Sequence, residues 1–141
     1  MNEREKVVTT HASGTFDVKL NPQSSEEDAD GTGLGRLSID KQFHGDLEAT
    51  SKGEMLSAGT SVKGSAGYVA IERVRGTLRG RTGTFILQHR GTTTRGAPQL
   101  TITVVPDSGT GGLKEVSGTM TINIVNGKHF YEFDYTLPAA R

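Results

Sequence analysis

Five polar side chains in this sequence occupy positions where an apolar residue is expected, and they are the first candidates for chemistry. Lys41, Glu72, His89, Tyr131 and Tyr135 each fall on the apolar side of a stretch in which polar and apolar residues alternate. If these stretches form strands, the five side chains face the interior. A few polar groups in an apolar surround are typical of a small-molecule site. The pattern therefore predicts a binding site inside a β-structure.

Glu72 and His89 are the candidate catalytic residues. Burial raises the pKa of a carboxyl group and lowers that of an amine, so Glu72 or Lys41 could exchange protons near neutral pH. His89 follows Phe85 on the same face and could orient or protonate a ligand. In the alternative interpretation Glu72 pairs with Lys41, both stay charged, and His89 is a hydrogen-bonded core or rim residue. The residues alone leave both interpretations open.

The candidate ligand-binding residues share a predicted inward orientation and are Lys41, Tyr68, Tyr131, Tyr135, Phe85 and Phe133. The two tyrosines near the C-terminus would offer hydroxyl donors to a carbonyl or carboxylate ligand, although tyrosine also fills small barrels by packing. The facing of residues 68–74 is ambiguous, because Val69 and Ile71 compete with the face of Tyr68 and Glu72. We favour the tyrosine face.

We expect no metal and no cofactor. The four histidines, His11, His44, His89 and His129, lie in separate stretches without ligand spacing, and cysteine is absent. Glycine-rich residues 31–35 and 108–112 complete neither a dinucleotide fingerprint nor a P-loop, so we interpret them as turns. Serine is not found in a nucleophile-elbow context.

Alternation with a period of two dominates the chain and predicts strands. The expected strands are eight in number and lie at residues 14–20, 36–43, 47–55, 68–74, 84–89, 99–105, 119–125 and 128–137. The strongest local signal is Asn126-Gly127, which predicts a type I′ hairpin turn that places Ile122 opposite Tyr131. The frequent glycines, 19 of 141 residues, fit short strands joined by tight turns.

The predicted fold class is all-β, a closed eight-stranded antiparallel barrel, because an open sheet of this size would leave two exposed edges. A β-sandwich is the alternative that alternation alone does not exclude. Residues 1–141 are expected to form a single domain. Residues 1–11 and the acidic loop at 21–35, which holds almost nothing apolar, are expected to be mobile.

Four segments carry a resemblance to a known family: residues 39–48 (IDKQFHGDLE), 64–70 (GSAGYVA), 85–89 (FILQH) and 104–111 (VVPDSGTG). They resemble an uncharacterised bacterial family of small domains whose fold is similar to the allene oxide cyclase barrel, over nearly the whole chain after Ala12. The resemblance implies an eight-stranded barrel with a central cavity and assembly into small homo-oligomers. It implies no activity, and no catalytic residue of a cyclase is carried over.

Charge and hydropathy limit the kinds of partner that this protein is expected to bind. Sixteen Lys and Arg balance sixteen Asp and Glu, so no net field attracts nucleic acid or an anionic membrane. Apolar runs stay far below the roughly 20 residues of a membrane helix, and the charged N-terminus does not read as a signal peptide. We therefore expect a cytoplasmic protein without a nucleic-acid or membrane partner.

These observations leave three hypotheses about function. The leading one is a barrel that binds a small, partly apolar organic molecule in its interior. The second is a cyclase or isomerase that uses Glu72 or His89 for proton transfer, and whether the protein is an enzyme stays open. The third is a filled barrel that acts as an oligomeric structural module, which an interior packed by Phe85, Phe133, Tyr131 and Met120 would favour.

Overall fold

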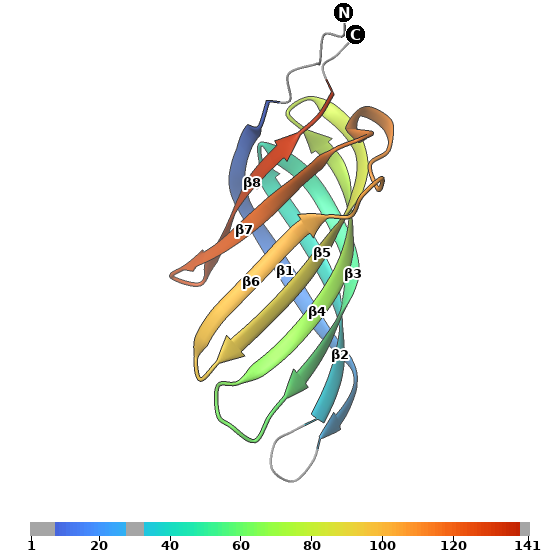
Figure 1. Ribbon diagram of the computed structural model, residues 1–141. Coiled ribbons are helices and arrows are strands. Elements are labelled where there is room, and N and C mark those ends of the chain that lie inside the picture. The colour runs from blue at the N-terminus through green and yellow to red at the C-terminus, as the bar shows by residue number, and fades with distance from the viewer. Residues whose placement is uncertain (1–7, 28–32, 139–141) are drawn as a thin grey trace, which may run out of the picture.

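The structure, a computed structural model, is a closed antiparallel barrel in which eight strands follow one another in chain order (Figure 1). It describes residues 8–27 and 33–138. The strands are β1 (Thr10–Glu27), β2 (Gly33–Gly45), β3 (Leu47–Gly59), β4 (Ala66–Leu78), β5 (Arg81–Thr94), β6 (Ala97–Val104), β7 (Ser117–Val125) and β8 (Lys128–Thr136), with a short 3₁₀ helix η1 (Gly111–Leu113) before β7. The predicted barrel is confirmed, and the sandwich is excluded.

Several strands are longer than the sequence predicted. β1 continues to Glu27 and pairs with β2 from Gly33, so the segment that we predicted as an acidic loop is largely strand. Thr10 and His11, predicted to be mobile, pair with β8. A hairpin can extend beyond the core because backbone hydrogen bonds need no apolar side chains. Residues 1–7 and 28–32, which those two predictions also covered, lie outside the described residues.

The hairpin between β7 and β8 has the predicted turn and register. Asn126 and Gly127 have φ of 51° and 78°, as a type I′ turn requires. Val125 pairs with Lys128, and Ile122 pairs with Tyr131. Because side chains alternate between the two faces of a strand, this register fixes which side of β8 faces the interior.

The seam between β6 and β7 is the shortest in the barrel. Only Ile102↔Met120 and Thr103↔Thr119 pair across it in the described part of the chain. Beyond these pairs, the lower parts of β6 and β7 diverge (Figure 1). Pro98 pairs with Thr93 of β5 and lies in the part of β6 that has no partner in β7, where a residue without a backbone N–H is tolerated. The barrel is therefore closed on this side by a short stretch of backbone pairing.

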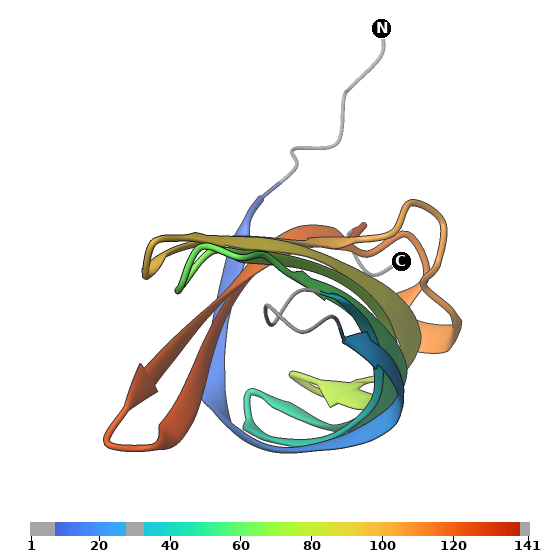
Figure 2. The ribbon, with the colours of Figure 1, turned by 90° about the horizontal axis from the view of Figure 1, so that it is seen from below.

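The interior is packed at one end and open at the other. At the packed end, where β1 begins and β8 ends (Figure 1), inward side chains such as Leu47, Leu78, Phe85 and Phe133 are fully buried. At the open end, viewed along the barrel in Figure 2, inward side chains are exposed: Leu20 by 44%, Leu100 by 39% and Ile124 by 60%. Inward orientation and burial are therefore different properties in this barrel.

The inward face of β4 is the one that carries Tyr68. Ala70, Glu72 and Val74 are buried, whereas Val69 and Ile71 are about half exposed. This confirms the facing that the sequence left ambiguous. Among the described residues, no helix is both long and apolar enough to cross a membrane.

Candidate polar site in the barrel interior

Four polar side chains from consecutive strands meet inside the barrel: Lys41 of β2, Ser51 of β3, Glu72 of β4 and His89 of β5. Lys41 Nζ donates to Glu72 Oε1 at 2.9 Å, and His89 Nε2 lies 2.6 Å from the same oxygen. Ser51 Oγ donates to the other carboxylate oxygen at 2.5 Å. We call these residues the polar cluster. The carboxylate of Glu72 is its centre, since every other member bonds to it.

The strand register brings these side chains together. Lys41 and Ser51 are direct partners across β2 and β3. Glu72 lies opposite Gly53 on β3, and a Cβ atom at Gly53 would approach the Glu72 Cα to 2.6 Å. The missing side chain therefore lets β3 and β4 approach closely beside the carboxylate. His89 lies well inside β5, which runs on to Thr94, and not at a strand end as the sequence suggested.

Glu72 is a permanent anion at working pH. Its side chain is fully buried. Burial has the largest single influence and raises its pKa, but the hydrogen bonds from His89 and Ser51 and the positive charge of Lys41 together outweigh burial and lower the pKa to about 2. The geometry agrees with the second of the two interpretations that the sequence left open, in which Glu72 pairs with Lys41 and stays ionised. Glu72 is consequently no proton donor or acceptor near neutral pH.

Lys41 supplies the positive charge of the cluster. Nζ lies 4.9 Å from the ring centroid of Phe16 and 5.7 Å from that of Phe43, so both rings contribute cation–π attraction. An ammonium group has three N–H donors. One of them bonds to Glu72, the single hydrogen-bond partner of Nζ among the described residues. The ammonium group can therefore donate to a further oxygen.

His89 has a defined proton arrangement. An ionised carboxylate only accepts hydrogen bonds, so Nε2, which faces Glu72, carries a hydrogen. In the neutral ring Nδ1 then holds a lone pair. Nδ1 has no hydrogen-bond partner among the described residues. In the same part of the chain, every side-chain nitrogen or oxygen that is sealed from solvent does have a partner, so Nδ1 is not one of the sealed atoms. Nδ1 therefore keeps some contact with solvent.

The accessible side of the cluster is formed by Lys41 and His89. These residues retain 9% and 4% exposure, whereas Glu72 retains none. Across the sheet, Glu72 pairs with Gly53, Gly53 with Ile39, and Ile39 with Leu20. Leu20, at the end of this series of cross-strand neighbours, is 44% exposed. The polar cluster thus lies close to the depth at which the interior opens to solvent.

Tyr68 lies on the same face of β4 as Glu72, nearer the open end. Its ring covers Gly91 of β5, where a Cβ atom would collide with it. The tyrosine is half-buried, and burial followed by the negative charge of Glu72 raises the pKa of its hydroxyl. The hydroxyl therefore stays protonated and can donate or accept a hydrogen bond.

The other predicted ligand-binding residues belong to the packed end. Phe133 stacks against Phe85 and Tyr135, with ring centroids 5.7 and 5.3 Å apart. The Tyr131 hydroxyl accepts a hydrogen bond from Leu47 N at 2.9 Å and donates to the His44 carbonyl at 3.0 Å. These four side chains face inward as predicted, but their contacts are those of a core. The structure brings Lys41, Glu72 and His89 together. It places the other four predicted residues in the packed end of the barrel: Tyr131, Tyr135, Phe85 and Phe133.

Ser51 is the member of the polar cluster that the sequence analysis did not name as a candidate. Its side chain is 2% exposed and binds Glu72. The available signal was its place in the alternation two residues after Ala49, together with a strand register that sets it opposite Lys41. That register depends on the hairpin between β2 and β3, whose turn contains Gly45 with a φ of 110°.

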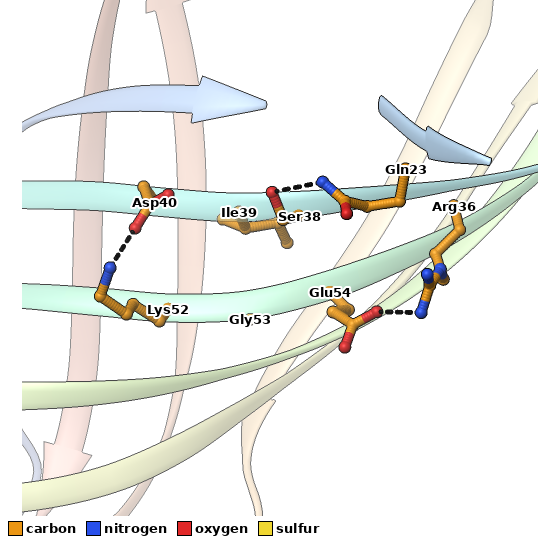
Figure 3. A pocket seen from close by; sticks show the side chains of 8 residues that line it. All are labelled: Gln23, Arg36, Ser38, Ile39, Asp40, Lys52, Gly53 and Glu54. Carbon is orange, nitrogen blue, oxygen red and sulfur yellow. Dashed lines mark hydrogen bonds and ion pairs between the residues drawn. The ribbon is translucent and has the colours of Figure 1, made fainter. Parts of the chain in front are cut away.

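A hollow of about 450 Å³ lies elsewhere, on the outer face of β2 and β3 (Figure 3). Two ion pairs cross it, Arg36 with Glu54 at 3.2 Å and Lys52 with Asp40 at 2.9 Å. All four side chains are substantially exposed, and such pairs contribute little free energy. We interpret this hollow as a solvated ionic surface.

The described residues contain no group of three His, Asp or Glu side chains arranged to hold a metal ion. The four histidines of the sequence are dispersed accordingly. His11 contacts Asp134 and Glu132 on the barrel exterior, whereas His89 contacts Glu72 inside it.

Comparisons with known proteins define the family. Among curated proteins, none matches the chain. The family model described as "Protein of unknown function (DUF3224)" matches residues 12–135. A crystal structure of a DUF3224 protein of unknown function from Shewanella oneidensis MR-1 is similar to this chain, with 54% sequence identity and a TM-score of 0.87 over 94% of this chain and 100% of the other. The chain therefore belongs to the DUF3224 family of proteins of unknown function.

Proposed function

We propose that the barrel binds a small, partly apolar organic molecule through its open end, with an oxygen of the molecule at the polar cluster. The observation that carries the proposal is the ammonium group of Lys41, which is held in the interior with donors to spare. The apolar body of the molecule would cover inward side chains that are otherwise exposed, including Leu20, Leu100 and Ile124. A polar anchor within an apolar lining is the usual design of such sites.

The charge of the cluster favours an oxygen-bearing ligand group, either a carboxylate or a carbonyl. Lys41 and Glu72 cancel each other's charge, so the cluster does not repel an anion. Hydrogen bonds from an ammonium group to an ionised or carbonyl oxygen are stronger than neutral ones in a site with little water. Tyr68 adds a hydroxyl on the side of the open end.

Because the packed end is filled by buried side chains, a ligand would enter the barrel only from the open end. Phe85, Phe133, Tyr131 and Met120 are buried there, as the structural-module hypothesis requires. That hypothesis accounts for this half of the barrel. It does not account for the exposed inward side chains of the other half, or for the diverging lower parts of β6 and β7. An organic ligand would cover both.

Binding is tested with two named probes. Titration of the anionic fluorophore 1-anilinonaphthalene-8-sulfonate should give a saturable increase in fluorescence, and decanoate should displace it more strongly than decan-1-ol. The double variant Lys41→Met/Glu72→Gln removes both charges of the buried pair, and we expect it to lose the preference for decanoate by about tenfold, the equivalent of one charge-assisted hydrogen bond.

The matched control is Lys52→Met/Asp40→Asn, which removes an exposed ion pair of the same length on the outer faces of β3 and β2. It should leave both affinities within about twofold, since exposed pairs contribute little. Absence of saturable binding to the wild type would overturn the proposal. So would equal effects of the two double variants.

A further inference from the structure

We propose that His89 and Lys41 enolise a carbonyl compound bound in the barrel, with His89 as the base and Lys41 as the donor to the enolate oxygen. The substrate class is a ketone or related carbonyl compound with an acidic hydrogen on the neighbouring carbon and a partly apolar body. This inference rests on the proposed binding function and adds an activity to it.

His89 has the arrangement of an oriented base. Its Nε2–H donates to Glu72 Oε1, with 2.6 Å between nitrogen and oxygen, which fixes the tautomer and leaves the Nδ1 lone pair without a protein partner and not sealed from solvent. A carboxylate in this position also stabilises the imidazolium ion that forms when Nδ1 takes a proton. Glu72 therefore acts through His89 and is a positioning residue.

Lys41 lies beside the imidazole because both side chains bond to the same oxygen of Glu72. One molecule can thus place its carbonyl oxygen against Nζ and its neighbouring carbon against Nδ1. The ammonium group is fixed by Glu72 and by the ring of Phe16 before any charge develops on the substrate. Donors held in place in a site with little water stabilise a developing oxyanion strongly.

The step is balanced without any co-reactant. Nδ1 of His89 takes the proton from the carbon, and the electrons of the broken C–H bond form the C=C bond of the enolate. The electron pair of the C=O π bond moves to oxygen, which accepts hydrogen bonds from Lys41. Return of the proton to the same carbon exchanges its hydrogen with solvent, and return to a more distant carbon of a conjugated enolate shifts a double bond.

The activity is tested by hydrogen exchange. 2-Tetralone and phenylacetone are incubated with the protein in D₂O, loss of the hydrogens beside the carbonyl is followed by proton NMR, and binding is measured in the same samples by saturation-transfer NMR. We expect a rate about 100-fold above that of an equal concentration of free imidazole, within the usual range for a positioned base. His89→Gln should reduce this rate to the imidazole background while its amide still donates to Glu72.

His129→Gln is the matched control. His129 is a half-buried histidine on the inward face of β8, where its ring lies 5.0 Å from that of Phe16. This variant should keep the exchange rate within about twofold of the wild type, because an uninvolved side chain changes neither base nor donor. Equal losses in the His89 and His129 variants would overturn the assignment of the base.

The positioning role of Glu72 has its own readout. Glu72→Gln should lower kcat for exchange at least tenfold with little change in KM, because the ketone does not contact the carboxylate. If this variant fails to fold, the comparison of His89→Gln with His129→Gln still decides the proposal.

The two proposals fail in different ways. Exchange no faster than free imidazole for a ketone that binds overturns the enolisation and leaves the binding function intact. Failure of the wild type to bind the ketones, 1-anilinonaphthalene-8-sulfonate and decanoate overturns both.

Discussion

The two ends of this barrel share one strand pattern and differ in what it covers. At the packed end, inward side chains such as Leu47 and Phe85 are fully buried. At the open end the same alternation continues, yet Leu100 and Ile124 are 39% and 60% exposed. The difference indicates that folding free energy is concentrated in one half of the molecule, while the other half has surface left for a ligand.

The polar cluster lies between these two halves. Its carboxylate, Glu72, is sealed, whereas Lys41 and His89 keep a small exposure. A charged group at this depth stays ionised because it is paired, and its partners stay reachable because the interior opens nearby. The predictions below test whether the two ends differ as this arrangement requires.

The largest expected effect is the loss of an aromatic side chain from the packed end. Phe133→Ala removes a fully buried ring that stacks between Phe85 and Tyr135, and it should lower the free energy of unfolding by about 3–5 kcal/mol. Leu100→Ala at the open end should cost about 1 kcal/mol or less, since much of that side chain already faces solvent. Urea unfolding measures both.

The wild type and both variants should show the same dependence on urea concentration, so that a shift in midpoint reports stability. Comparable losses for Phe133→Ala and Leu100→Ala would contradict the division into a packed and an open end.

The sequence predicts which side chains of most strands face inward. The alternation correctly places Lys41, His89 and Tyr131 inside, because a strand has only two faces and one of them holds the apolar side chains. For Glu72 it left two competing faces of β4, which the observed burial of Ala70 and Val74 resolves. Asn126-Gly127 fixes the register of its hairpin through local backbone geometry alone. Local rules suffice for both features.

Other features depend on strands that are distant in the sequence. Leu20, Leu100 and Ile124 lie on the inward faces of their strands, but their exposure follows from the stagger of the strands and the short seam between β6 and β7. The extension of β1 to Glu27 depends on pairing with β2. The charge state of Glu72 required the positions of its partners, which the sequence offered only as one alternative.

A pH dependence centred on Glu72 is the second expected effect. Its pKa is about 2 in the folded protein, against 4.5 for an ordinary glutamate. A lowered folded-state pKa stabilises the fold above pH 4.5, and this contribution is lost as pH falls toward 2. The loss should be roughly 3 kcal/mol, measured as the difference in unfolding free energy between about pH 6 and about pH 2.

Lys41→Met/Glu72→Gln should lose less stability over this range than the wild type, because it lacks the Glu72 carboxylate whose protonation causes the loss. The exposed-pair variant Lys52→Met/Asp40→Asn should follow the wild type more closely, since Asp40 is partly solvated in both states. Parallel pH profiles for wild type and the Lys41/Glu72 variant would show that Glu72 does not stabilise the fold as an anion.

Removal of one tyrosine hydroxyl should reduce the free energy of unfolding more at the packed end than at the open end. Tyr131→Phe leaves the buried Leu47 N–H without its acceptor and should cost about 1–3 kcal/mol. Tyr68→Phe at the open end should cost less than about 0.5 kcal/mol, because the half-buried hydroxyl has no hydrogen-bond partner among the described residues and can turn to water. Thermal unfolding at neutral pH distinguishes the two outcomes. If Tyr68→Phe lost as much stability as Tyr131→Phe, the Tyr68 hydroxyl would contribute to stability as a buried hydrogen-bonding group does, which contradicts the prediction.

The smallest expected effect concerns His11, on the exterior of the seam between β1 and β8. The pKa of His11 is raised above 6.5, first by its 2.6 Å hydrogen bond to Asp134 and to a smaller extent by Glu132. A raised folded-state pKa stabilises the fold below pH 6.5, and the contribution disappears as pH rises through the folded-state value. NMR titration of His11 should give a midpoint above 6.5 that falls in Asp134→Asn and falls less in Glu132→Gln. An unchanged midpoint in Asp134→Asn would mean that this half-exposed pair is screened by solvent, and that the β1–β8 seam relies on its backbone hydrogen bonds.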